Sequence, residues 1–125
     1  FERLDLNKPI LLVEGPIDSL FLPNCIASVN ASLATTANWF LKGTRISSDL
    51  LTVVLDNEPR GKEVVKEYEK AIESGLKIVI WPKAAERYKD INDMIMNKVD
   101  PVALIKSNTH RGLMANLEFN KWKKV

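Results

Sequence analysis

Short apolar runs alternate with helical patterns along the chain. Residues 10–13, 25–29, 51–55 and 77–82 are expected to be strands, and the first and third runs are almost entirely apolar. Runs of this kind are typical of strands that are buried on both faces of a parallel sheet. The alternation predicts an α/β fold in which right-handed crossovers join about four mainly parallel strands, sandwiched by helices.

The most regular helical pattern lies between the third and fourth strands. Val64, Val65, Tyr68, Ala71 and Ile72 recur at helical spacing, and a glycine follows at position 75, where helix ends favour it. Further helices are expected at about residues 16–22, 35–42, 94–96, 101–106 and 112–124. We divide the chain into a lead-in or linker at 1–8, a domain at 9–97, and a helical extension at 98–125 that packs on the domain or on a partner.

Acidic residues follow two of the strands directly. Glu14 comes after residues 10–13, and Asp56 and Glu58 come after residues 51–55. Ligands of open α/β sheets bind beyond the carboxyl ends of the strands, so these acids are candidate site residues, although a single acid can also simply begin a turn. Converging carboxylates repel one another unless a cation or protons intervene. Oxygen ligands with no His or Cys nearby favour Mg²⁺ or Mn²⁺ over zinc.

Three short motifs together resemble the signatures of a TOPRIM domain. They are Glu14-Gly15-x-x-Asp18, Asp56-x-Glu58 and Lys89-Asp90-Ile91-Asn92-Asp93. TOPRIM is the Rossmann-like, metal-binding catalytic fold of bacterial-type primases, topoisomerases, OLD-family nucleases and RecR-like proteins. Residues 31–35 resemble the stretch between the first two acidic motifs of primases, and residues 56–60 together with 89–93 are similar to the DNA primases of T-even-type phages. The resemblance covers roughly residues 9–97, and it departs from the usual Asp-x-Asp of the second motif at Glu58.

The resemblance implies a primase that makes short RNA primers on single-stranded DNA from NTPs, using one or two Mg²⁺ or Mn²⁺ ions. The implied catalytic and metal-binding residues are Glu14, Asp56, Glu58 and Asp90. Asp18 and Asp93 are further candidate ligands, although both also suit the start of a helix, and Asn92 or Asp93 is expected to cap the helix at 94–96. Asp90, outside that helix, is expected to face the metals.

Cationic residues near the motifs are candidates for contacts with nucleotide phosphates. They are Arg60, Lys62, Lys89 and Lys42, the last in an expected loop at 42–45. From residue 98 onward there are six Lys or Arg against two acids. The candidate DNA contacts in this basic end are Arg111, Lys121, Lys123 and Lys124, but a solvated helix face fits the same charges. Alternatively, the tail docks on a replicative helicase through Phe119 and Trp122.

Composition narrows the class of protein further. Hydrophobic residues make up 46% and charged residues 27% of 125 residues, which is typical of one globular domain. The sequence contains no apolar run near the ~20 residues of a membrane helix, so we expect no membrane partner and a cytoplasmic location, in the host if the protein is phage-encoded. A single cysteine, Cys25, supports neither a disulfide framework nor a zinc site, and His110 in a polar loop is expected to be a bystander.

Other TOPRIM activities fit less well or remain open. A topoisomerase needs a nucleophilic tyrosine, but Tyr68 lies inside the regular helix and Tyr88 beside the third motif. An OLD-type nuclease uses much the same acids, and a RecR-like DNA-binding module could keep the fold without catalysis. The chain begins with Phe1, which suggests part of a longer protein. We therefore expect the isolated 125 residues to make little or no primer.

Overall fold

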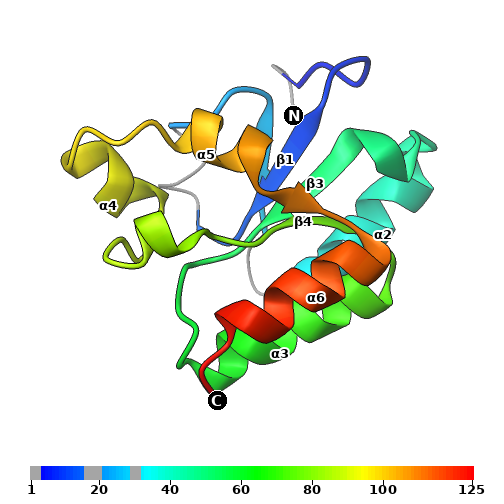
Figure 1. The fold of residues 1–125 in the computed structure, drawn as a ribbon. Coiled ribbons are helices and arrows are strands. Elements are labelled where there is room, and N and C mark those ends of the chain that lie inside the picture. Colours follow the sequence, from blue (N-terminus) through cyan, green and yellow to red (C-terminus); the bar gives the residue numbers. More distant parts are fainter. Residues whose placement is uncertain (1–3, 16–20, 29–31) are drawn as a thin grey trace.

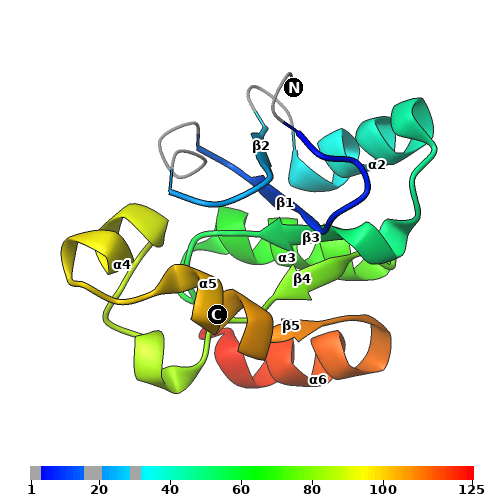
Figure 2. The ribbon, with the colours of Figure 1, turned by 90° about the horizontal axis from the view of Figure 1, so that it is seen from above.

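The computed structural model describes residues 4–15, 21–28 and 32–125. Within them the chain forms one mixed sheet in the order β2-β1-β3-β4-β5 (Figure 2). The strands are β1 (Ile10–Val13), β2 (Cys25–Ala27), β3 (Leu51–Val54), β4 (Lys77–Val79) and β5 (Thr109–His110). β1 to β4 are parallel and β5 is antiparallel to β4. The expected α/β architecture is thereby confirmed, and it is consistent with a Rossmann-like TOPRIM fold.

Helices cover both faces of the sheet (Figure 1). The described helices are α2 (Leu33–Thr44), α3 (Lys62–Glu73), α4 (Ile91–Met96), α5 (Pro101–Ser107) and α6 (Gly112–Trp122), with short 3₁₀ turns η1 (Ser48–Leu50) and η2 (Lys83–Ala85). α2, α3 and α6 lie together on one face, and α4 and α5 lie on the other. None of these helices is long and apolar enough to cross a membrane.

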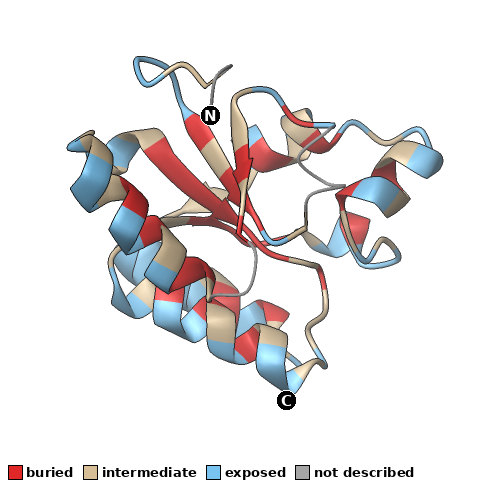
Figure 3. Cartoon of the chain, turned by 180° about the vertical axis from the view of Figure 1, so that it is seen from behind, coloured by how far each residue is buried: buried red, intermediate tan, exposed pale blue. Residues whose placement is uncertain are grey.

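The central strands are buried because both of their faces carry helices. Ile10, Leu12, Leu51 and Val53 have no solvent exposure, and the buried segments in Figure 3 follow the strands and the inner sides of the helices. α3 turns Val65, Tyr68 and Ala71 inward as its sequence pattern predicts, and Gly75 after it has a φ of +74°, which glycine adopts without strain. The continuous apolar runs therefore become strands buried on two sides.

The order of the strands places a topological switch point between β1 and β3. From β1 the chain moves to β2 on one side, then returns to β3 on the other side of β1. Val13 of β1 is paired in register with Val54 of β3, so the two strands end together. The crevice beyond such a switch point is the usual ligand-binding place of an open α/β sheet.

Several expected boundaries differ from the structure. The second and fourth strands end at Ala27 and Val79, earlier than the predicted 29 and 82. His110, expected in a loop, belongs to β5, where it pairs with Ile78. Most of the helix expected at 16–22 lies outside the described residues, and its last two positions form a turn and a bend. A two-residue strand such as β5 is too short to produce a periodic signal.

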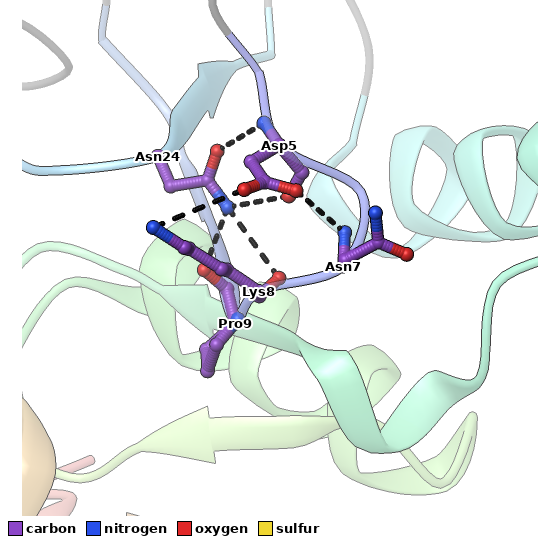
Figure 4. Close-up of polar contacts among 5 residues, drawn as sticks. All are labelled: Asp5, Asn7, Lys8, Pro9 and Asn24. Atoms are coloured by element: carbon purple, nitrogen blue, oxygen red, sulfur yellow. Dashed lines mark hydrogen bonds and ion pairs between the residues drawn. The ribbon is translucent and has the colours of Figure 1, made fainter.

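The lead-in segment is held against the amino end of the sheet by Asn24, as Figure 4 shows. Asn24 Nδ2 donates to the carbonyl oxygens of Asp5 (2.8 Å) and Pro9 (2.9 Å), and its Oδ1 accepts from the Asp5 amide (2.7 Å). Asn24 has a φ of +48°, a left-handed conformation that asparagine tolerates better than most residues. Residues 5–9 are therefore fixed to the turn before β2.

The last helix, α6, packs on α3. The Phe119 and Tyr68 rings stack with their centroids 5.7 Å apart, and the Trp122 ring centroid lies 4.3 Å from that of Tyr68. Beyond α6, the Lys124 amide donates to the Pro59 carbonyl oxygen at 2.8 Å. The C-terminus consequently lies beside the start of α3 (Figure 1), at the carboxyl edge of the parallel strands.

Candidate active site

The acids of the first two motifs lie at the same edge of the sheet. Glu14 follows β1 and is exposed, and Asp56 lies two residues after β3 and is partly buried. Because β1 and β3 are parallel neighbours that end in register, both acids lie at the carboxyl edge of the sheet beside the switch point. Asp18 of the first motif lies outside the described residues. The second motif, residues 56–58, is called the acid loop below.

The acid loop is held by the side chain between its two acids. Asn57 is only 7% exposed, and its Nδ2 donates to the carbonyl oxygens of Ala85 (2.8 Å) and Tyr88 (3.0 Å). Its backbone amide donates to the Lys89 carbonyl oxygen at 2.6 Å. These bonds fasten the second motif to the segment that leads into the third motif.

A bond from the far end of the sequence completes this arrangement. Trp122 Nε1, on α6, donates to Asn57 Oδ1 at 2.8 Å in a buried contact. Sequence reasoning missed Asn57, because an asparagine after a strand is ordinary turn chemistry and gives no sign of partners 28 to 65 positions away. Buried polar groups need such partners, and this side chain has them on both its nitrogen and its oxygen.

Two more side chains bind the backbone where β3 leaves the sheet. Trp81 Nε1 donates to the Leu55 carbonyl oxygen (2.7 Å), and the Tyr68 hydroxyl donates to that of Asp56 (3.2 Å). Burial raises the pKa of Tyr68 well above its usual range, and the negative charge of Asp56 raises it further. Tyr68 therefore remains a protonated donor at neutral pH, inside the core rather than at a reactive surface.

A lysine of the third motif pairs with an acid of the second. Lys89 Nζ lies 2.9 Å from Glu58 Oε1. The hydrogen bond and charge of Glu58 raise the pKa of Lys89, and the charges of Asp56 and Asp90 add smaller increases. Because the Lys89 side chain is 64% exposed, water screens its ion pair with Glu58. Lys89 can therefore exchange Glu58 easily for another partner. The structure thus brings Glu58, Asp56, Asp90 and Lys89 into one electrostatic neighbourhood.

The cap of α4 differs from the expectation. The helix begins at Ile91, and its cap is Asp90, whose Oδ1 accepts from the Asp93 amide at 2.8 Å. The prediction of Asn92 or Asp93 as the cap, with Asp90 free of the helix, was wrong. Asp93 Oδ2 accepts from the Lys89 amide at 3.1 Å. Asp90 and Asp93 both accept hydrogen bonds from local backbone amides. Any metal-binding role of these two acids must therefore be compatible with those bonds.

Within the described residues, the candidate carboxylates do not gather into a metal site. In the part of the chain that the structure describes, no three His, Cys, Asp or Glu side chains stand close enough together to hold one ion. Asp18 is not among the residues searched. The metal-binding roles of Glu14, Asp56, Glu58, Asp90, Asp18 and Asp93 accordingly stay predictions.

The candidate phosphate-binding cations fall into two places. Arg60 and Lys62 lie at the entrance of α3, and Arg60 lines a surface pocket of about 510 Å³ together with Glu58, Glu86 and Lys124. Lys42 is not in a loop but in the last turn of α2. Since α2 runs back to the amino end of β3, Lys42 lies at the opposite edge from the acids. A shared site with them is therefore ruled out.

The basic residues near the C-terminus also lie in two separate places. Arg111 pairs with Asp49 and donates to the Gly75 carbonyl oxygen, both at the amino edge of the sheet. Lys121, Lys123 and Lys124 lie at the other end of α6, a helix about 16 Å long at 1.5 Å per residue. The length of α6 therefore separates Arg111 from the three lysines, and the DNA-binding role of these four residues stays a prediction.

The aromatic residues of the tail are turned inward. Phe119 is 2% and Trp122 is 9% exposed, since both pack against Tyr68. The suggestion that these two side chains dock on a helicase was therefore wrong. Of the three lysines, Lys121 pairs with Glu118 and Lys123 lies over the Phe119 ring, while Lys124 lines the pocket beside Glu58.

Taken together, the fold and the site define a mainly parallel α/β protein with acids at the switch point of its sheet. No protein-family model matches the chain. Over 120 residues it is 34% identical to the DNA primase of Enterobacteria phage T4, a match that covers 93% of this chain. The chain is thus related to that primase, although it spans only 33% of the primase's length.

Proposed function

We propose that this chain forms the TOPRIM catalytic domain of a phage-type DNA primase, which makes short RNA primers on single-stranded DNA by Mg²⁺-dependent nucleotidyl transfer. The observation that carries the proposal is the similarity to the phage T4 primase over 93% of the chain. The acids on the two strands that flank the switch point support it. Template choice and a replicative helicase partner are proposed for the intact protein, and no surface is assigned to the helicase. Neither a nuclease nor a RecR-like role is favoured by this similarity.

The acids suit the metal that the proposal needs. Glu14, Asp56, Glu58 and Asp90 offer only oxygen donors, the ligand type that Mg²⁺ and Mn²⁺ prefer. At Glu58 the Lys89 ammonium is already the counter-cation, and its exposure allows it to leave for a substrate phosphate. These acids would hold one or two ions, and bound Mg²⁺ would neutralise phosphate charge and activate the attacking hydroxyl.

The remaining side chains would position and neutralise the substrate. In nucleotidyl transfer a 3′-hydroxyl attacks the α-phosphate of an incoming NTP, and protein groups chiefly orient the reactants and offset charge. Lys89, Arg60 and Lys62 stand at the rim of the acid loop, where they would contact the triphosphate. Asn57 would keep the loop in one conformation through its buried bonds.

The direct test is an assay of the intact protein that contains this chain. With single-stranded DNA, NTPs and Mg²⁺, we expect new oligoribonucleotides and no degraded DNA. The products are resolved on a sequencing gel, with labelled NTPs to score synthesis and labelled DNA to score cleavage. Degraded DNA without new RNA would overturn the proposal in favour of a nuclease.

Divalent cations should stabilise the folded chain. An ion at ten times its dissociation constant adds about 1.4 kcal/mol by mass action, which raises the melting temperature by several degrees. Glu14→Gln should reduce this gain, because the amide keeps the shape of the side chain and loses its charge. Melting curves at rising Mg²⁺ or Mn²⁺ concentration measure both effects.

The matched control for this measurement is Glu73→Gln. Glu73 ends α3 at the opposite edge of the sheet and is exposed. This variant should retain the full stabilisation by metal. Equal melting shifts in the wild type, Glu14→Gln and Glu73→Gln would contradict a metal site that includes Glu14.

Lys121, Lys123 and Lys124, at the end of α6, should carry most of any metal-independent affinity of the chain for single-stranded DNA. Each lost phosphate contact flattens the slope of log affinity against log salt by about 0.7. Replacing Lys121, Lys123 and Lys124 by Ala should therefore reduce the slope by up to about 2. Fluorescence titrations of a labelled oligonucleotide at several salt concentrations give the slope.

A second triple variant serves as the matched control, because it removes three positive charges from another part of the surface. Lys42, Lys66 and Lys70 are exposed on α2 and α3, and Lys42 lies at the amino edge. Their replacement by Ala should leave the slope close to that of the wild type. If the Lys121/Lys123/Lys124 variant keeps the wild-type slope, the tail has no role in binding nucleic acid.

A further inference from the structure

The C-terminal segment reaches the acid loop at two points. Trp122 Nε1 donates to the Asn57 side chain, and the Lys124 amide donates to the carbonyl oxygen of Pro59, the residue after the loop. Asn57 and Trp122 are 65 positions apart in the sequence. The loop that carries two candidate catalytic acids is therefore braced by the last helix of the chain.

The bond between these two side chains is shielded from water. Asn57 is 7% and Trp122 is 9% exposed. Without the indole N–H, Asn57 Oδ1 would lose its donor in this buried contact. The other end of the same amide holds the carbonyl oxygens of Ala85 and Tyr88, so a rotation of Asn57 to find a new partner would break those bonds as well.

We infer that Trp122 is a positioning residue, which acts through Asn57 to fix the backbone of the acid loop and with it the directions of Asp56 and Glu58. Asn57 is the middle residue of the loop, so its buried side chain sets how the neighbours on either side are presented. The part of this inference that concerns metal rests on the proposed function, and the part that concerns the loop does not.

The packing role of Trp122 can be separated from its hydrogen bond. Its ring lies against Tyr68 and Phe119, with centroid distances of 4.3 and 6.0 Å. Trp122→Phe keeps an aromatic ring there and removes the donor. Phe119→Leu is the matched control, because it weakens the same aromatic cluster and Phe119 makes no hydrogen bond to the acid loop in the structure.

Amide hydrogen exchange of the 125-residue chain, followed by NMR, tests the loop itself. The reporters are the Asn57 amide, bonded to Lys89, and the Glu58 amide, bonded to the Asp56 carbonyl oxygen. In Trp122→Phe both should exchange about tenfold faster relative to the amides of β1, which report global opening. In Phe119→Leu the loop and β1 amides should change together. Parallel changes in both variants would overturn the inference.

A double variant supplies a second, independent criterion. If the indole acts through Asn57, Trp122→Phe should accelerate exchange of the Glu58 amide in the wild-type background and add little once Asn57→Ala is present. A residue that only fills the core would give the same increment in both backgrounds. Full additivity would therefore also count against the inference.

Mn²⁺ affinity separates this inference from the proposed function. Calorimetric titration of the chain with Mn²⁺ should give a dissociation constant several-fold weaker in Trp122→Phe than in Phe119→Leu. If the wild type binds no Mn²⁺, the metal-dependent function fails, while the exchange measurements still decide whether Trp122 fixes the loop. If the wild type binds and both variants bind equally well, the positioning role is refuted.

Discussion

Asp56→Asn is expected to abolish primer synthesis by the intact protein while the fold remains. The asparagine keeps the shape of the side chain but lacks the charge that would hold a cation beside the triphosphate. A metal contact worth several kcal/mol corresponds to a loss of about a thousandfold or more in rate. The bonds that fix the loop use the backbone carbonyl oxygen of residue 56 and the side chain of Asn57, and both survive the substitution. Primer yield on single-stranded DNA, with circular dichroism as the check of folding, measures the result.

The matched control is the same substitution at the other edge of the sheet. Asp49 lies before β3, where it is 71% exposed and pairs with Arg111. An exposed ion pair contributes at most about 1 kcal/mol, so Asp49→Asn should leave primer synthesis unchanged. If Asp56→Asn loses a DNA-degrading activity instead, the nuclease alternative is correct. Normal priming by Asp56→Asn would remove Asp56 from the catalytic set.

The edge of the sheet that carries the acids could be predicted from the sequence because the signal is local. An apolar run that ends in an acid predicts both the strand and the point where the chain leaves the sheet, as at Val13-Glu14 and at Leu55-Asp56. Parallel strands buried on both faces put such exits at one edge. The structure places Glu14 and Asp56 there.

The bracing of the acid loop could not be predicted because its partners are remote in sequence. Asn57 finds Ala85, Tyr88 and Trp122 only after the sheet and α6 have packed. Likewise, the close spacing of the basic residues in the sequence does not indicate that α6 separates Arg111 from the terminal lysines. Charge in a sequence window says little about charge on a surface once a helix intervenes.

Errors at helix ends have a similar physical origin. Asp90, Asn92 and Asp93 are all good capping residues, so composition alone does not choose among them. The structure chooses Asp90, which places Ile91 and Met94 in the core at 2% and 0% exposure. Tertiary burial of the apolar residues, rather than capping preference, thus sets where α4 begins.

Phe119→Ala is expected to destabilise the chain by about 3–5 kcal/mol, a large part of the 5–15 kcal/mol that holds a typical domain together. Phe119 is 2% exposed and stacks on Tyr68, which in turn binds the backbone of the acid loop. Its truncation leaves a cavity between α6 and α3 that the surrounding side chains can fill only in part. Equilibrium unfolding in urea measures the change, and the transition should remain cooperative if α6 belongs to the same core.

Leu113→Ala on the same helix provides the comparison. Leu113 is 73% exposed, so its truncation removes little buried area and should change stability by no more than about 0.5 kcal/mol. The contrast between two apolar residues of one helix follows from which side of α6 faces Tyr68. If Phe119→Ala proved as mild as Leu113→Ala, α6 would not be packed on α3 in solution. The hydrogen bond from Trp122 to Asn57 of the acid loop would then be lost as well, because it depends on that packing.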